Sequence, residues 1–145
     1  MRTPPRPARA AALVPLIAAL ALTAGCSGGG PAAPPTPEWP TALTVDADTA
    51  APFWVVWTAV AEQGDTAAST LQPALDQLDE AGYSGQEWDP ACVTASEQQL
   101  AALTGYADVV GVGVAFASEK DVGAFDTLFE GTVVSVTSGE YTCTA

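Results

Sequence analysis

Three cysteines are the side chains of this sequence best suited to covalent chemistry: Cys26, Cys92 and Cys143. Cysteines of exported proteins pair as disulfides, whereas C-x-x-C spacings and accompanying histidines indicate metal or redox sites. The chain has no histidine and no C-x-x-C spacing. We therefore expect a structural Cys92–Cys143 disulfide, with metal or redox chemistry as the less favoured alternative. Cys26, beside the flexible run Ser27–Gly30, is then left over as a thiol open to modification.

The residues before Cys26 follow the plan of an export signal. A basic start is formed by Arg2, Arg6 and Arg9. It is followed by Ala10–Ala24, an uncharged apolar stretch that ends in small residues. These fifteen residues are fewer than the roughly 20 that a membrane-spanning helix needs. The pattern predicts a cleaved signal rather than a permanent transmembrane helix.

The run Leu22–Cys26, with the sequence LTAGC, resembles the bacterial lipobox. This resemblance implies that residues 1–25 are removed and that the Cys26 thiol carries a diacylglyceryl group. The protein would then be a lipoprotein on the extracytoplasmic face of the cell membrane, held there by its lipid. A plain secretory signal, with Cys26 as an ordinary thiol, is the alternative.

Charge and composition limit the partners and the chemistry. Removal of the signal takes all the arginines with it and leaves Lys120 against seventeen acidic residues, a net charge of −16. Such a surface repels nucleic acid and anionic lipid headgroups, so neither is expected as a partner. With one lysine and no histidine, the chain lacks the usual side chains for acid/base or covalent catalysis at neutral pH. We expect a binding protein without cofactor rather than an enzyme.

Several acidic pairs could suggest metal binding or glycoside hydrolysis: Asp46 with Asp48, Asp76 with Asp79 and Glu80, and Glu87 with Asp89. The first pair lacks the further ligands, glycine and closing glutamate of an EF-hand loop. Nothing in the sequence fixes the separation that a glycosidase needs between its carboxylates. We interpret all of them as solvated surface and expect no metal site.

The composition divides the processed chain into a tether and one domain. Residues 26–40 comprise Cys26 and a Gly-rich, then Pro-rich, segment that can extend to roughly 40 Å. Residues 41–145 are long enough for one small α+β domain. Trp39 either docks on this domain or is an aromatic residue of the tether.

Hydrophobic periodicity predicts the elements of the domain. Strands are expected at residues 53–60, 84–88, 109–116 and 132–137, the last turning at 138–139 toward Tyr141 and Cys143. One helix should begin at a Ser69 or Thr70 cap and end at Gly82, and a second should begin at a Thr94–Glu97 capping box and end at Gly105. A third, capped by Ser118 with Asp121, should bury Val122, Phe125 and Phe129 and end at Gly131.

This order suggests a ferredoxin-like, split β-α-β sheet with the main helices on one face and the short helix as an insertion. A parallel three-layer α/β domain is the alternative. The order also resembles the sporulation-related repeat (SPOR) domain over residues 53–60, 71–82, 110–118 and 132–143. That resemblance implies binding to the glycan strands of peptidoglycan. The chain departs from the SPOR pattern in Val114-Ala115-Phe116, where the family has Gly-Pro-Phe, and in the insertion at 89–104.

Strict alternation along residues 109–116 gives one bulky face and one nearly bare face, the latter carrying Gly111, Gly113 and Ala115. Beside the aromatic strand, this bare face could form a shallow glycan groove lined by Trp54 or Trp57, which point to opposite sides. Alternatively, the inserted segment 89–104 covers it. Two functions follow: a wall-glycan binder, or an accessory subunit whose acidic surface binds a basic envelope protein.

Overall fold

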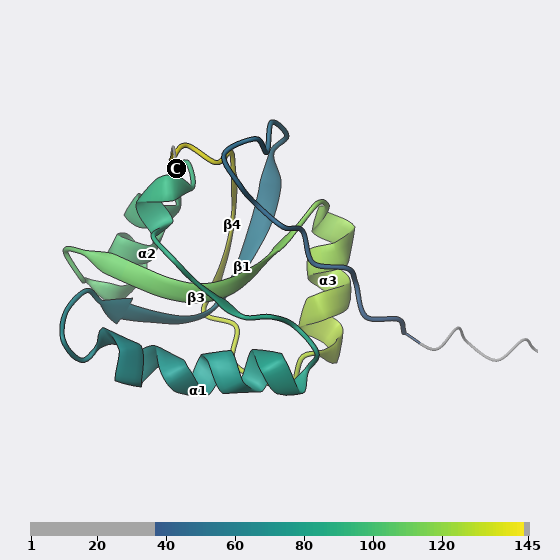
Figure 1. The fold of residues 1–145 in the computed structure, drawn as a ribbon, viewed down its shortest axis with the longest axis horizontal. Helices are drawn as coiled ribbons and strands as arrows, with labels where there is room; N and C mark the ends of the chain where they lie inside the picture. Colours follow the sequence, from purple (N-terminus) through teal and green to yellow (C-terminus); the bar gives the residue numbers. More distant parts are fainter. Residues whose placement is uncertain (1–36, 144–145) are drawn as a thin grey trace, which may run out of the picture. The chain divides into compact units, whose positions relative to one another are not determined.

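Residues 37–143, which the structure describes, form a four-stranded antiparallel sheet with helices on both of its faces (Figure 1). The structure is a computed structural model. The strands are β1 (Phe53–Glu62), β2 (Gln86–Trp88), β3 (Val109–Phe116) and β4 (Ser135–Gly139). Their order is β2-β3-β1-β4, and every neighbouring pair is antiparallel. The parallel alternative is therefore wrong.

Three α-helices and one short 3₁₀ helix lie between the strands of this region: α1 (Ala67–Glu80), η1 (Pro90–Cys92), α2 (Ser96–Thr104) and α3 (Glu119–Leu128). The predicted helix ends are confirmed at Gly82 and Gly105, whose φ angles of 85° and 78° suit glycine. The predicted cap of α3 is also confirmed, since the Ser118 hydroxyl accepts from the Asp121 amide at 3.2 Å. The predicted end of α3 at Gly131 is wrong: the helix ends at Leu128, because the backbone of Phe129 is already extended. Phe129 is nevertheless buried, as predicted.

Two predicted helix starts are wrong. α1 begins one turn earlier than expected, after Thr66, and the hydroxyls of Ser69 and Thr70 donate to the Thr66 carbonyl instead of capping the helix. The capping box at residues 94–97 does not form, because Thr94 bonds the distant Glu140 carbonyl. Side chains that local rules assign to caps are thus used for other contacts.

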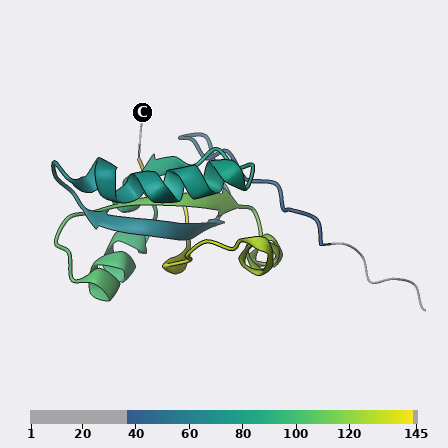
Figure 2. The same ribbon diagram turned by 90° about the horizontal axis from the view of Figure 1, so that it is seen from below.

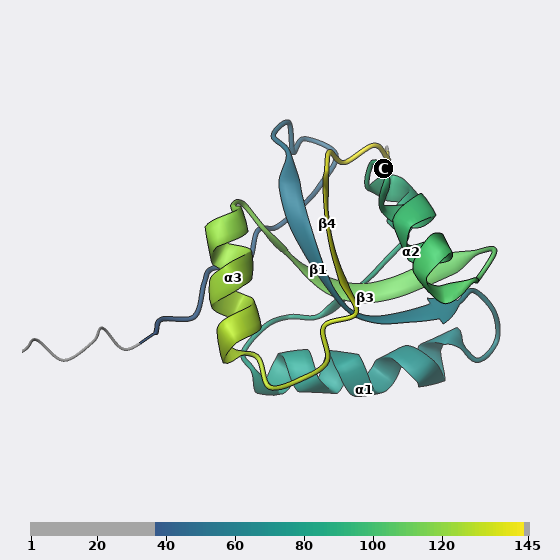
Figure 3. The same ribbon diagram turned by 180° about the vertical axis from the view of Figure 1, so that it is seen from behind.

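Helices α1 and α3 cover one face of the sheet. Val56 of β1 and the bulky side of β3 pack there against Leu71 and Leu78 of α1 and against Phe125 of α3. Figure 2 shows α1 running along the central strands, and Figure 3 shows α3 beside the same sheet from behind. The main apolar core of the domain lies between these layers.

β1 bends at a bulge, where the register with β3 shifts between Trp57 and Ala59. The Thr58 hydroxyl donates to the Val112 carbonyl at 3.2 Å and so satisfies its polar group inside the sheet. Pairing between β1 and β4 ends at Trp57 opposite Ser135, just before the bulge. β4 is therefore shifted toward Gly139 relative to the predicted strand at 132–137.

Candidate functional site

The predicted alternation of β3 is confirmed. Val112 and its bulky neighbours belong to the core under α1 and α3, whereas Val109 and Ala115 belong to a second cluster on the opposite face. A Cβ at Gly111 would lie 2.7 Å from Cε3 of Trp57, and one at Gly113 would lie 2.6 Å from the Val56 carbonyl oxygen. The bare face therefore exists because β1 approaches β3 closely at both glycines, through the indole of Trp57 at Gly111 and through the Val56 carbonyl at Gly113.

The glycan groove, one of the two arrangements considered for this face, is closed in the structure. Trp57 is 0% exposed and Ala115 2% exposed, and Gly111 and Gly113 are buried as well. They are covered by the inserted segment 89–104, from which Val93 and Leu100 pack into the second cluster. The alternative prediction, that the insertion covers the small face, is the arrangement that the structure has.

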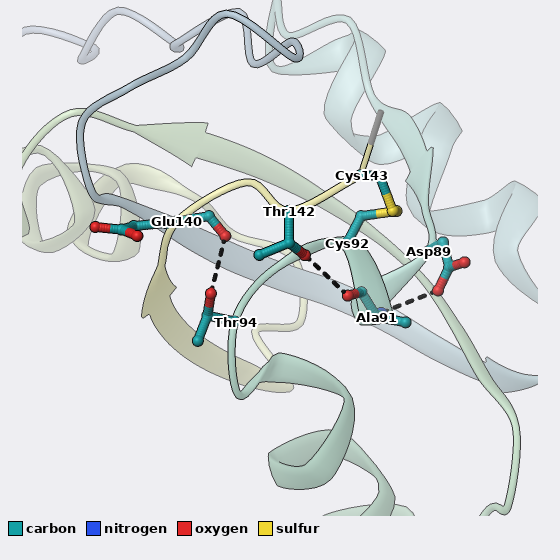
Figure 4. The surroundings of a disulfide bond; sticks show 7 residues. All are labelled: Asp89, Ala91, Cys92, Thr94, Glu140, Thr142 and Cys143. Atoms are coloured by element: carbon teal, nitrogen blue, oxygen red, sulfur yellow. Dashed lines mark hydrogen bonds between the residues drawn. A yellow bond between two sulfur atoms is a disulfide. The ribbon is translucent and has the colours of Figure 1, made fainter. Parts of the chain in front are cut away.

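Several long-range contacts hold this cover segment, defined as residues 89–104, to the last strand and the residues after it. Cys92 is bonded to Cys143, with their Cα atoms 4.9 Å apart, so the predicted disulfide is present. Figure 4 shows hydrogen bonds that accompany it, among them one from the Thr94 hydroxyl to the Glu140 carbonyl and one from Thr142 to the Ala91 carbonyl.

A buried polar chain adds a further attachment of the cover segment. The Thr137 hydroxyl oxygen accepts from the Trp57 indole N–H at 2.9 Å and lies 2.7 Å from the Ser96 hydroxyl. Ser96 is the first residue of α2 and is fully buried. Because all three groups are shielded from water, breaking one bond leaves another polar group without a partner. These hydrogen bonds therefore fix α2 over Trp57.

Trp54 lies on the face opposite Trp57, as predicted, and packs half-buried against the main core. It lines a shallow hollow of about 300 Å³ together with Pro52, Ser138 and Glu140. Trp54 is therefore not part of the face that carries Gly111 and Gly113.

Trp39 docks on the domain, which answers the question that the sequence left open. Its ring centroid lies 5.8 Å from that of Tyr83 and 6.2 Å from that of Phe125. The Tyr83 hydroxyl donates to the Pro40 carbonyl at 2.6 Å and holds the adjoining backbone. Trp39 nevertheless stays 42% exposed.

This exposed indole forms one wall of a hollow of about 480 Å³, which we call the Trp39 hollow. The other walls come from the end of α1 and from the end of α3 with the loop after it. They include Gln77, Glu80, Leu128, Phe129 and Glu130. Two charged residues line it, Glu80 and Glu130, and both are carboxylates. This hollow was not predicted from the sequence, in which the Trp39–Pro40 pair after a Pro-rich run is its one local signal.

Burial shifts the pKa of Tyr83, the residue on which Trp39 docks. Burial, and secondarily the negative charge of Asp121, raise the pKa of Tyr83 above its ordinary value of 10.0, so its hydroxyl donates to Pro40 up to a higher pH than an ordinary tyrosine would. In residues 37–143, no group of three or more acidic or cysteine side chains is arranged to hold a metal ion. The predicted acidic pairs contribute to the surface charge.

Comparisons with protein-family models, with curated proteins and with solved structures found no match to this chain. No helix within residues 37–143 is long and apolar enough to cross a membrane. The predicted signal, the lipobox and Cys26 lie outside the described residues.

Proposed function

We propose that this chain is an extracytoplasmic lipoprotein whose small α+β domain binds a basic protein of the cell envelope and catalyses no reaction. One observation carries the choice of partner: residues 37–143 contain a single basic residue, Lys120, and all seventeen acidic residues of the chain. A domain with this charge attracts cationic partners over a range set by the ionic strength and repels anionic ones. Both domain-level functions were open from sequence, and this charge favours the accessory subunit.

The peptidoglycan-binding proposal has less support because its groove is closed. The strand order β2-β3-β1-β4, with α1 and α3 on one face, supports the ferredoxin-like plan that a SPOR domain shares. The cover segment, however, occupies the opposite face and buries Trp57. A glycan strand would have to displace that segment before it reached the small residues of β3.

The lipid anchor is supported by the pairing of the other two cysteines. Cys92 and Cys143 form a disulfide with each other. Cys26 is then the single cysteine of the sequence without a partner in the domain. A thiol at the end of an apolar export signal is the position at which a lipoprotein is acylated.

Metabolic labelling tests the anchor. Cells that express the chain are given a fatty-acid probe, and the wild type is compared with Cys26→Ala. We expect label and membrane retention in the wild type alone. An unlabelled wild type, or a variant that stays equally membrane-bound, contradicts the anchor.

Two parallel binding experiments test the partner class. The chain purified from membranes in neutral detergent is incubated with purified sacculi and, separately, with solubilised envelope proteins, and binding partners are crosslinked and identified. We expect a basic envelope protein that is released by added salt, and no sedimentation with sacculi. Sedimentation with sacculi, without any basic protein captured, would replace this proposal by the glycan-binding one.

A further inference from the structure

We infer that the Trp39 hollow receives a lysine or arginine side chain from the basic partner. This inference rests on the proposed function and names the site and the chemical group that the partner inserts. The hollow has a volume of about 480 Å³. A single extended side chain fits in such a space, whereas a folded surface does not.

The walls of the hollow are suited to a cation. Glu80 comes from the end of α1 and Glu130 from the residues after α3, and both are exposed. No basic side chain lines the hollow to neutralise them. A guanidinium or ammonium group between two carboxylates forms charge-assisted hydrogen bonds, which are stronger than those between neutral groups.

Trp39 adds a second, independent attraction. An indole is the best aromatic partner for a lysine or arginine cation, and the aliphatic stem of either side chain packs on apolar surface. Leu128 and the buried Phe129 supply that surface. Trp39 itself is held by Tyr83 and Phe125, so it can contact a ligand without first becoming ordered.

Three other hollows of the described surface fit a cation less well. The one at Trp54 is lined by a single carboxylate, that of Glu140. A third hollow, beside Thr58 and Pro73, has no charged side chain in its lining. A fourth, at α2, has Glu97 as its one charged residue and no aromatic residue. Of these four hollows, the Trp39 hollow is the one that combines an exposed indole with two carboxylates.

The test measures the affinity of hexa-arginine for the chain in neutral detergent by titration calorimetry. Glu80→Gln/Glu130→Gln is compared with Glu62→Gln/Glu87→Gln, a matched pair that removes the same charge at exposed positions away from the hollow. We expect the first pair to weaken binding by about tenfold and the second by less than about twofold. Trp39→Ala should weaken binding by about fivefold.

Each other result overturns the inference. If both pairs weaken binding equally, the peptide binds the acidic surface diffusely, and the proposed function stands without this site. If the Trp39→Ala variant binds normally, the indole has no part in recognition. Trp39→Phe keeps an aromatic ring on Tyr83 and shows whether a loss in Trp39→Ala comes from the missing ring or from a loosened segment. If hexa-arginine does not bind the wild type, whereas a tetramer of N-acetylglucosamine does, both the site and the proposed function are wrong.

Discussion

Gly111→Ala is the sharpest test of whether the small face of β3 is closed. The new Cβ would lie 2.7 Å and 2.8 Å from two ring carbons of Trp57 and 3.1 Å from the Ala59 carbonyl oxygen. Carbon atoms in contact normally lie about 3.5–4.0 Å apart. The indole or the strand would therefore have to move by about 1 Å, the difference between these separations.

Neither group moves freely. Trp57 is fully buried and its indole N–H is bonded to Thr137. Overpacking of this kind costs about 1–3 kcal/mol. Alanine offsets about 0.5–1 kcal/mol of that cost because it restricts the unfolded chain more than glycine does. The midpoints of these two ranges leave a net loss of about 1 kcal/mol. Since each kcal/mol lowers the melting temperature of such a domain by about 4–8 °C, we expect a fall of about 4–8 °C.

The control is Gly123→Ala in α3, where an added Cβ meets nothing within 4 Å. Glycine inside a helix is less favourable than alanine by about 0.5–1 kcal/mol, so this variant should be more stable than the wild type. Thermal and denaturant unfolding of the oxidised chain, followed by near-ultraviolet circular dichroism, measures both. If Gly111→Ala is as stable as the wild type, Trp57 is not packed on β3. If Gly111→Leu also folds and melts normally, the face is open and the glycan groove returns as a proposal.

Two further predictions concern the disulfide and the docked end of the tether. The bridge between Cys92 and Cys143 spans 51 residues. A Cys92→Ala/Cys143→Ala variant should therefore lose about 4 kcal/mol of stability by the loop-entropy relation. Alkylation of both thiols in the denatured, unreduced wild type would refute the bridge. Because the pKa of Tyr83 is raised by burial and then by Asp121, the stability from its bond to Pro40 should be complete below about pH 10 and lost as the pH rises through the folded pKa. The ultraviolet absorbance of tyrosinate should show one late component that Tyr83→Phe removes, and a titration unchanged in that variant would contradict the assignment.

Local pattern predicted the parts of the fold that depend on neighbouring residues. Alternation placed the two faces of β3, and glycines after α1 and α2 ended both helices where expected. The cap formed by Ser118 and Asp121 involves residues three apart, so its geometry is contained in the sequence. Both domain cysteines were predicted to pair because an exported domain offers neither another partner.

The predictions failed where a distant residue competes for a side chain. Thr94 was expected to cap α2, but its hydroxyl bonds Glu140, and the helix instead follows Ala95 with a φ of 64°. Ser96 likewise turns to Thr137. The Trp39 hollow could not be predicted for the same reason, since its walls converge from the tether end, α1 and the loop after α3 only once the domain is folded.

The attachments of the cover segment impose an order on how the protein is made. Three residues of the cover segment are joined to residues that come later in the chain: Ser96 to Thr137, Thr94 to Glu140 and Cys92 to Cys143. Synthesis runs from the N-terminus, so these partners emerge after the other three strands. Until then the cover segment is held over Phe53 and Trp57 by apolar packing such as that of Val93 and Leu100. A nascent chain therefore passes through a stage in which the aromatic strand β1 is less firmly covered, and exposed apolar surface promotes aggregation and chaperone binding. Closure of the Cys92–Cys143 disulfide then joins the cover segment covalently to the end of the domain.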